Sequence, residues 1–448
     1  MQRLLVSFVA VVLVLASGAA GAQGGQPSYL HLSDVHLDLS GASTDTDPQL
    51  WAITKAKLAS ILSGPDAPAF VIYTGDLPGH YDCGDQATNP DCALQTDQQP
   101  VHDADVQAVL QDLRDLVADS GTPLLYMPGN NDSLAGDYFS FTDASGETPL
   151  SLVPGTGYPA VNASKPCGSP PCLVSNPRPG LGFYSARPVD GLRVVALNSV
   201  ILGREYHEVD GVSQLDAGNV QLDWLAGELD DAEGREKVLI AMHIPPGDDA
   251  YAVSAGKPET WMWARQPQGE DEGDASGYGG PTGEGDGSGG ASAAPVSGAD
   301  WLDRFLDLVA AHRDTVIGLA YGHTHLDELR RLHGRDGGVT EVAVSAPGIT
   351  TNHGNNPGFK LVTYDRDTKE LLDFVTFYTK RGNPAWGDDR YSFSTHYGCA
   401  GQSILACLTS ATYADTAAVN QVMEELYTVM NGPPSYDTSS GIEVEYGQ

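Results

Sequence analysis

Five short polar segments of the chain carry side chains that bind transition metals. Their seven residues with ligand chemistry are Asp34, His36, Asp76, Asn130, His243, His323 and His325. In the D-x-H and H-x-H pairs, alternate residues of an extended segment point to the same side, so both members can face one site. Mixed nitrogen and oxygen donors suit zinc, iron or manganese better than calcium. We therefore expect a metal site, with zinc as the first choice.

The number of ligands suits two divalent metal ions that share a bridging carboxylate. Two metals about 3.5–4 Å apart can hold the attacking and the leaving oxygen of an in-line displacement at phosphorus. A bridging hydroxide is then the nucleophile, so no serine or cysteine nucleophile is needed. The chain contains neither a G-x-S-x-G nor a P-loop pattern. These observations predict a metal-dependent hydrolase of phosphate esters.

Three expected strands alternate with two expected helices at the start of this pattern. The strands are Pro27–Leu32, Phe70–Thr74 and Pro123–Met127, and the helices are Leu50–Leu62 and Val101–Ala118. This order is typical of a parallel sheet. Each strand ends at one of the polar segments, and ligands in such sheets sit beyond the carboxyl ends of the strands. We therefore expect the polar segments to meet at one edge.

The second half alternates again and then ends in antiparallel strands. The expected elements are a strand pair at Phe183–Ala186 and Leu192–Leu197, helices at Leu215–Leu229, Asp300–His312 and Thr409–Met430, and strands at Lys237–Ala241, Val316–Ala320, Asp327–Leu332, Thr340–Ser345, Phe359–Tyr364 and Leu371–Tyr378. Residues 140–180 are expected to form a surface loop. The segment 266–295 is almost all Gly, Ser, Ala, Asp and Glu, which predicts a mobile insert. The tail from Asn431 is also expected to be mobile.

The first 22 residues have the pattern of a secretory signal peptide. Arg3 precedes an apolar run from Leu4 to Ala16, and Ala20-Gly-Ala22 offers a cleavage site before Gln23. The alternative to a signal peptide is a transmembrane anchor, but the apolar run is short for spanning a bilayer. We therefore expect a secreted or periplasmic protein with no transmembrane segment.

The six cysteines agree with export, because exported proteins can form disulfides. The cysteines fall into three close pairs, Cys83 with Cys92, Cys167 with Cys172, and Cys399 with Cys407. Six cysteines allow 15 pairings, and local pairing is the simplest. Zinc ribbons are the alternative, but no pair has their typical C-x₂-C spacing.

The formal net charge of the chain is −35. This charge repels nucleic acid and anionic membranes, so nucleic acid is not expected as the main partner.

The motifs together resemble the calcineurin-type metallophosphoesterases, and within them the acid sphingomyelinase-like phosphodiesterases. The broader resemblance rests on the motifs at Ser33-Asp-Val-His36, Thr74-Gly-Asp76, Gly129-Asn130, His243 and Gly322-His-Thr-His325. The narrower one rests on Gly75-Asp-Leu-Pro-Gly-His80, Met242-His-Ile-Pro-Pro-Gly247, the residues that follow His325 through Glu328, Ser345-Ala-Pro347 and Asn356-Pro-Gly358. The resemblance covers roughly residues 28 to 380.

The resemblance implies a fold and a role for each ligand. The fold would be an α/β four-layer α/β/β/α sandwich of two mixed sheets, with a catalytic domain at 23–380 and a helical C-terminal extension and tail at 381–448. Asp34, His36 and His325 would bind the first metal, and Asn130, His243 and His323 the second. Asp76 would bridge the two metals.

One position departs from the family pattern. Relatives usually have Gly-Asn-His, and that histidine helps to protonate the leaving group, whereas this chain has Gly129-Asn130-Asn131-Asp132. Asn131 cannot supply a proton. His80 matches the other family histidine near the leaving group, so His80 is expected to take over the catalytic proton transfer. Fungal endopolyphosphatases, which resemble this family, also carry Gly-Asn-Asn-Asp.

Three functions remain open on the sequence. The leading interpretation is an exported phosphodiesterase acting on a small-molecule or lipid-headgroup phosphodiester. The alternatives are an endopolyphosphatase-like or phosphomonoesterase activity and a metal-binding pseudoenzyme. Trp261 and Trp263 fit a substrate groove or the core equally well. The natural substrate and the oligomeric state cannot be read from the sequence.

Overall fold

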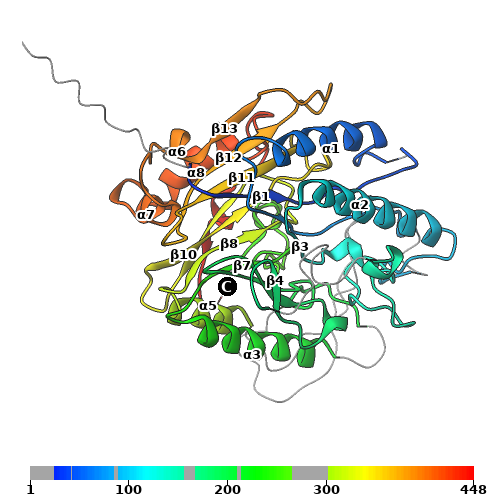
Figure 1. Ribbon diagram of the computed structural model, residues 1–448, viewed down its shortest axis with the longest axis horizontal. Coiled ribbons are helices and arrows are strands. Elements are labelled where there is room, and N and C mark those ends of the chain that lie inside the picture. The colour runs from blue at the N-terminus through cyan, green and yellow to red at the C-terminus, as the bar shows by residue number, and fades with distance from the viewer. Residues whose placement is uncertain are drawn as a thin grey trace, which may run out of the picture.

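The computed structural model describes residues 25–41, 43–84, 89–155, 167–208, 213–264 and 301–447. The expected signal peptide and the expected insert at 266–295 lie outside the described residues. In the described part, two mixed sheets pack face to face, with helices on both outer sides (Figure 1). The prediction of a four-layer α/β/β/α sandwich is confirmed.

The first sheet has six strands in the order β13-β12-β11-β1-β2-β3. Their bounds are β1 Ser28–Leu32, β2 Phe70–Tyr73, β3 Leu124–Tyr126, β11 Gly358–Tyr364, β12 Leu371–Tyr378 and β13 Arg390–Ser392. Strands β1, β2 and β3 are parallel, as the alternation with helices predicts, and β11 joins β1 antiparallel. Helices α1 (Pro48–Leu62) and α2 (Gln99–Ser120) cover the outer face of β1 to β3 (Figure 1).

The second sheet has eight strands in the order β14-β9-β10-β8-β7-β6-β5-β4. Their bounds are β4 Cys172–Ser175, β5 Tyr184–Val189, β6 Leu192–Ala196, β7 Lys237–Ala241, β8 Val316–Tyr321, β9 Leu329–His333, β10 Val339–Ser345 and β14 Glu443–Val444. Helices α3 (Gln214–Ala232) and α5 (Trp301–Ala311) cover its outer face. Because β6, β7 and β8 are parallel, the segments after β7 and β8 leave the sheet at one edge.

A buried ion pair joins the two sheets inside the apolar core. Lys360 on β11 donates from Nζ to Asp327 Oδ1 at 2.7 Å, and both side chains are almost fully buried. The other oxygen of Asp327 accepts from Thr376 and Tyr391. The carboxylate therefore has several donors, which is what an ion pair in an apolar interior requires.

The C-terminal region is more ordered than the sequence indicates. Its helices are α6 Phe393–His396, α7 Ile404–Leu408 and α8 Thr416–Leu426. The remaining short helix, α4 (Ala250–Ser254), follows β7 and does not belong to this region. The predicted single helix 409–430 is wrong, because a 3₁₀ turn at Ala411–Tyr413 precedes α8. The expected mobile tail is wrong too, since β14 pairs with β9 in parallel and buries Ile442 and Val444.

Two further expectations can be compared with the structure. Residues 140–180 are not entirely loop, because β4 pairs with β5. The cysteines form the three local disulfides Cys83–Cys92, Cys167–Cys172 and Cys399–Cys407. Local pairing, the simplest expectation, is therefore confirmed.

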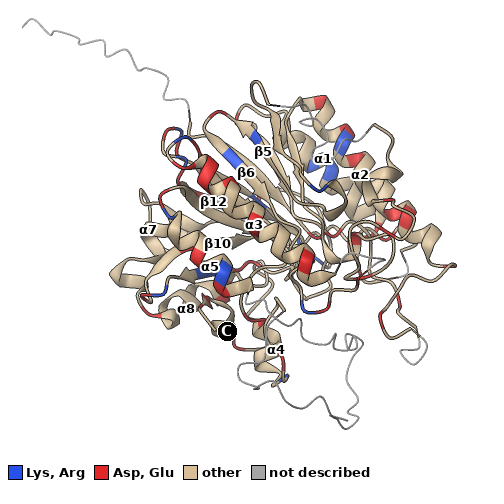
Figure 2. Cartoon of the chain, turned by 90° about the horizontal axis from the view of Figure 1, so that it is seen from below, with Lys and Arg blue, Asp and Glu red and all other residues tan. Residues whose placement is uncertain are grey.

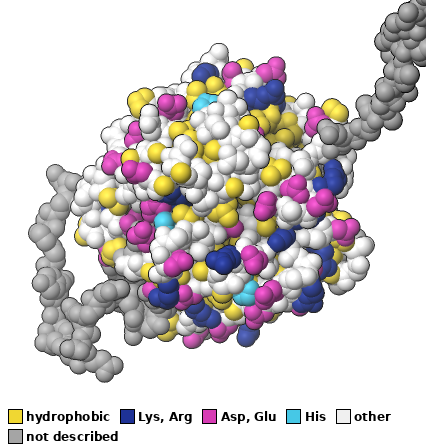
Figure 3. All heavy atoms as spheres, turned by 90° about the vertical axis from the view of Figure 1, so that its left-hand side faces the viewer, with side chains coloured by type: hydrophobic (Ala, Val, Ile, Leu, Met, Phe, Trp, Pro, Cys, Tyr) yellow, Lys and Arg dark blue, Asp and Glu magenta, His cyan; other side chains and the backbone are white. Residues whose placement is uncertain are grey.

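Acidic residues outnumber basic ones along the chain, 59 against 24. Figure 2 shows acidic residues on α3 and α5, whereas α1 carries two lysines and no acidic residue. On the face in Figure 3, acidic side chains are scattered among basic and apolar ones. Every helix in the described ranges is too short or too polar to cross a bilayer.

A buried glutamate on β10 predicts a pH-dependent stability. Glu341 is 1% exposed, and burial raises its pKa from the ordinary value of 4.5 to about 8. The folded state therefore binds a proton that the unfolded chain releases above pH 4.5, so stability should fall between about pH 4.5 and 8. Glu341→Gln should remove the part of this decrease in stability that comes from Glu341. In thermal melts the variant should match the wild type near pH 4 and melt higher at pH 8; equal melting temperatures at both pH values would contradict the assignment.

Candidate metal centre

All seven residues with ligand chemistry meet at one edge of the two sheets. Asp34 and His36 follow β1, Asp76 follows β2, Asn130 follows β3, His243 follows β7, and His323 and His325 follow β8. They form two groups of closely spaced donor atoms that share one residue, Asp76. The expected convergence is therefore present, while the role of these residues as metal ligands remains a prediction.

The first group contains Asp34, His36, Asp76 and His325, and all four residues are buried. The Nε2 atom of His36 lies 3.3 Å from Asp76 Oδ2 and 3.1 Å from His325 Nε2. The Nε2 atom of His325 lies 3.4 Å from Asp34 Oδ1. Two ring nitrogens and two carboxylates thus surround one point, an arrangement suited to a divalent cation.

The second group surrounds the other side of Asp76. Its Oδ2 atom lies 3.1 Å from His243 Nε2. The side-chain oxygen of Asn130 lies 2.9 Å from His243 Nε2 and 3.0 Å from His323 Nδ1. Since Oδ2 of Asp76 is close to both His36 and His243, this oxygen can serve both groups.

Outer hydrogen bonds orient the donors toward the centre. The Nδ1 atoms of His36 and His243 lie 3.0 and 2.6 Å from the carbonyl oxygens of Pro78 and Thr74. A carbonyl only accepts, so each ring carries a proton on Nδ1 and turns Nε2 inward. The Nε2 atoms of His36 and His325 lie 3.1 Å apart, so a proton or a cation must lie between them. The donor set therefore fits a metal.

The amide of Asn130 is held in one orientation. Its Nδ2 atom donates to Asp137 Oδ1 at 2.8 Å and to Asn131 Oδ1 at 3.0 Å. These two acceptors leave the amide oxygen to face His243 and His323. Asn131 therefore helps to orient a neighbouring donor.

The backbone at the site is strained in the way functional sites often are. Five of the seven residues have positive φ angles: Asp34 (50°), His36 (44°), Asp76 (62°), His323 (73°) and His325 (62°). Side chains other than glycine rarely adopt this region, and such strain persists only where surrounding contacts enforce it. The sharp turns aim consecutive polar residues into one small volume.

Close approach of the polar segments requires glycine at two positions. A Cβ atom on Gly129 would collide with the carboxylate of Asp76, and one on Gly322 would collide with Ser33 and approach Asp34. The carboxylate of Asp132 then joins the segments after β2 and β3, since it accepts from the N–H groups of Leu77 and Gly129. The Gly-Asn-Asn-Asp motif therefore has a structural function at both ends.

The charges of the centre favour ionised Asp76. Burial would raise the pKa of Asp76, but His243 and His36 outweigh this effect and hold it well below its usual range. Burial would lower the pKa of His36 and His243, but the Asp76 carboxylate raises each to about 9. Burial lowers the pKa of His323 and His325 well below the ordinary value, and it raises that of Asp34 to about 6.

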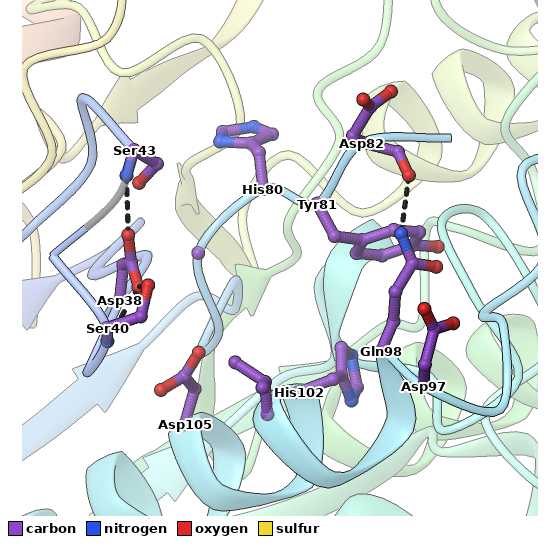
Figure 4. Close-up of a pocket in the computed structure, with 12 residues that line it drawn as sticks. Asp38, Ser40, Ser43, His80, Tyr81, Asp82, Asp97, Gln98, His102 and Asp105 are labelled. Atoms are coloured by element: carbon purple, nitrogen blue, oxygen red, sulfur yellow. Dashed lines mark hydrogen bonds between the residues drawn. The ribbon is translucent and has the colours of Figure 1, made fainter. Parts of the chain in front are cut away.

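His80 lies next to the first group, and one of its ring nitrogens comes within 4.8 Å of ring nitrogens of His36 and His325. Its ring stacks on His36 with a centroid distance of 4.1 Å and an angle of 12°. It also forms one wall of a cavity of about 350 Å³ between the segment 38–43 and the start of α2, which none of the seven ligand-type residues lines (Figure 4). The side chain is partly exposed, so a bound molecule can reach it.

Sequence reasoning missed several residues that contact the centre. Asp45 contacts His80, Asp137 holds Asn130, and His353 stacks on His325 at 4.3 Å. Single polar residues in loops give no pattern, so only the tertiary structure reveals them.

The sequence left two places open for Trp263, a substrate groove or the core. Trp263 is 1% exposed and packs edge-on against Phe305, so it belongs to the core.

Comparisons with known proteins agree with the site. No family model matches the chain. The mouse acid sphingomyelinase-like phosphodiesterase 3b is 22% identical over 443 residues, covering 88% of this chain and 80% of that protein. The human cyclic GMP-AMP phosphodiesterase SMPDL3A is 24% identical over 404 residues, covering 82% and 74%. Human sphingomyelin phosphodiesterase is 28% identical over 203 residues, which is 44% of this chain and only 24% of that protein.

Among solved structures, a dimetal phosphatase from Danio rerio aligns with a TM-score of 0.43 at 13% identity, covering 82% of this chain and 98% of that one. The sequence relatives and the site together define the chain as a hydrolytic phosphoesterase. Within that class it is related to the acid sphingomyelinase-like phosphodiesterases, as the motifs predict.

Removing the charge of Asp76 should remove metal from the protein. Asp76→Asn keeps the size of the side chain but removes the negative charge that balances two dications, so we expect the loss of at least one metal per chain and of nearly all turnover. Elemental analysis of the purified variant measures the metal content.

A matched control is Asp365→Asn. Asp365 follows β11, whose Thr363 pairs with Ser28 at the start of β1, so it lies at the opposite end of the sheet from the centre. This control should keep the wild-type metal content and rate. Full metal occupancy with wild-type turnover in Asp76→Asn would contradict a shared carboxylate.

Proposed function

We propose that this protein is an exported phosphodiesterase that holds two divalent metal ions, with zinc as the first choice and iron or manganese as alternatives. Asp34, His36 and His325 would hold the first ion, and Asn130, His243 and His323 the second, with Asp76 shared. The observation that carries the proposal is the position of Asp76 Oδ2, 3.3 Å from His36 and 3.1 Å from His243. One carboxylate oxygen between two donor groups is what a pair of metal ions requires.

Bound metal ions would activate water and neutralise charge on the phosphoryl oxygens. The chain itself supplies position and a proton. The sheet edge fixes the donors, and His80 stands at the wall of a cavity where a leaving group could extend. An alkoxide that leaves phosphorus needs a proton, and His80 is placed to give it. Asn131 cannot, because an amide does not titrate and its oxygen accepts from Asn130.

A diester substrate is favoured over a monoester because the similar proteins are named as phosphodiesterases of sphingomyelin or cyclic GMP-AMP. These relatives support a lipid-headgroup or other small-molecule diester. The Gly129-Asn-Asn-Asp132 motif favours a second candidate, cleavage of polyphosphate.

Export is supported by two observations. The first 22 residues have the pattern of a signal peptide, and all six cysteines form disulfides. Disulfides persist in oxidising compartments. We propose that the mature protein acts outside the cytoplasm, either secreted or in a periplasm.

A substrate panel tests the proposal. Purified protein should hydrolyse bis(p-nitrophenyl) phosphate faster than p-nitrophenyl phosphate, and a chelator should abolish both activities until metal is restored. Faster cleavage of the monoester or of polyphosphate would replace the proposed substrate class. No turnover of any of them by metal-loaded protein would indicate a pseudoenzyme.

The role of His80 predicts a dependence on the leaving group. General-acid catalysis typically contributes about 10²–10⁴-fold, and an alkyl leaving group needs it far more than nitrophenolate does. His80→Ala should therefore slow an alkyl phosphodiester by roughly that factor and a nitrophenyl diester far less. Steady-state kinetics on the two substrates measures the difference.

Metal content is the control for this variant, and it should stay unchanged because His80 is not proposed as a ligand. Asn131→His should restore part of the alkyl activity in the His80→Ala background if a histidine there can act as it does in relatives. An equal fall for both substrates, or a loss of metal, would make His80 a ligand or a structural residue instead.

A further inference from the structure

The side chain of His80 is held by a buried carboxylate in the segment between β1 and α1. We propose that Asp45 is a positioning residue for proton transfer, which fixes the ring of His80 against the metal centre. This inference rests on the proposed function of His80 as the proton donor. It adds a residue that the sequence motifs do not include.

Asp45 contacts His80 at two different atoms. The backbone N–H of His80 donates to Asp45 Oδ2 at 2.8 Å, and the ring Nδ1 lies 3.1 Å from both carboxylate oxygens. The side chain of Asp45 is 1% exposed, whereas that of His80 is 36% exposed. The buried carboxylate of Asp45 therefore holds both the backbone N–H and the ring of His80, whose side chain is exposed to solvent.

The contact determines which ring nitrogen is available to a substrate. An ionised carboxylate only accepts hydrogen bonds, so the proton of the shared contact lies on Nδ1 of His80. Burial opposes ionisation of Asp45, yet the hydrogen bond from His80 contributes to holding the pKa of Asp45 well below its usual range. In the protonated ring, Nε2 carries the second proton, and this is the proton that can pass to a leaving oxygen and leave the neutral Nδ1–H form behind.

Stacking completes the orientation. The ring of His80 lies on the ring of His36, 4.1 Å away and nearly parallel. A ring nitrogen of His80 comes within 4.8 Å of ring nitrogens of His36 and His325. Asp45 and His36 hold the imidazole next to the centre, and Asn352 Nδ2 lies 3.4 Å from its Nδ1. Such outer partners of reactive histidines typically contribute 10–100-fold to activity.

Backbone hydrogen bonds next to Asp45 also hold its segment in place. The neighbouring Thr46 donates from its N–H to the carbonyl of His36 at 3.1 Å and accepts from the N–H of Asp38 at 2.9 Å. Removing the carboxylate should therefore leave the segment in place. The loss of His80 orientation can then be measured in a folded protein.

Asp45 also accepts a hydrogen bond from Thr350, and this bond offers a matched control. The hydroxyl of Thr350 donates to Asp45 Oδ1 at 3.0 Å, which ties the segment after β10 to the segment after β1. If Asp45 served only to tie these segments, Thr350→Val would reproduce the effect of its removal. If Asp45 positions His80, the two substitutions should differ.

The experiment measures kcat/KM of the full-length, metal-loaded enzyme on an alkyl and on a nitrophenyl phosphodiester. Asp45→Ala and Asp45→Asn should slow the alkyl substrate by about 10–100-fold and the nitrophenyl substrate far less. Thr350→Val should leave the ratio between the two substrates unchanged. In the His80→Ala background, Asp45→Ala should have no further effect on that ratio.

The outcomes separate this inference from the proposed function. If His80→Ala changes the substrate ratio and Asp45→Ala does not, Asp45 is not a positioning residue, although His80 remains the donor. Equal effects of Asp45→Ala and Thr350→Val, or additive effects with His80→Ala, would overturn the inference in the same way. If His80→Ala itself leaves the ratio unchanged, the proposed proton donor is wrong, and the inference fails with it.

Discussion

The geometry of the site depends on one constraint, which is that the ring nitrogens of several histidines lie close to the buried carboxylate of Asp76. Asp76 lies between His36 and His243, and each of these rings turns its Nε2 atom inward because a backbone carbonyl holds its Nδ1. Such an arrangement is unfavourable for an apolar interior without a cation, since buried charges and lone pairs need partners. The sandwich can maintain it because two parallel strand sets end at the same edge and bring the polar segments within a few ångströms.

Other features of the site follow from this convergence. The positive φ angles at five donors and the glycines at 129 and 322 allow the chain to turn sharply and the segments to touch. Asp132 and Asp137 then satisfy the N–H groups and the amide that this crowding leaves inside. Asp45 lies outside the ring of donors and likewise holds a neighbouring group in place, the partly exposed side chain of His80. Asn131 contributes to this rigidity instead of supplying a proton.

Much of the architecture and of the centre could be predicted from the sequence, for physical reasons. Buried strands such as β2 and β8 give continuous apolar runs, and the D-x-H and H-x-H pairs have a spacing that few structural roles require. Residues such as Asp45 and Asp137 could not be found, because one aspartate in a loop has no periodicity and gains its role only through contacts distant in sequence. The strand β14 was missed for a similar reason, since two residues of a polar tail become a strand only by pairing with β9.

The central claim is that Asp76 is shared between two metal ions. Diffraction data from crystals of the metal-loaded protein, collected on both sides of the absorption edge of the metal, test it most directly. The account predicts two anomalous peaks about 3.5–4 Å apart, one between His36 and His325 and one between His243 and His323, with Asp76 in contact with both. A single peak, or two peaks of which only one touches Asp76, would contradict it.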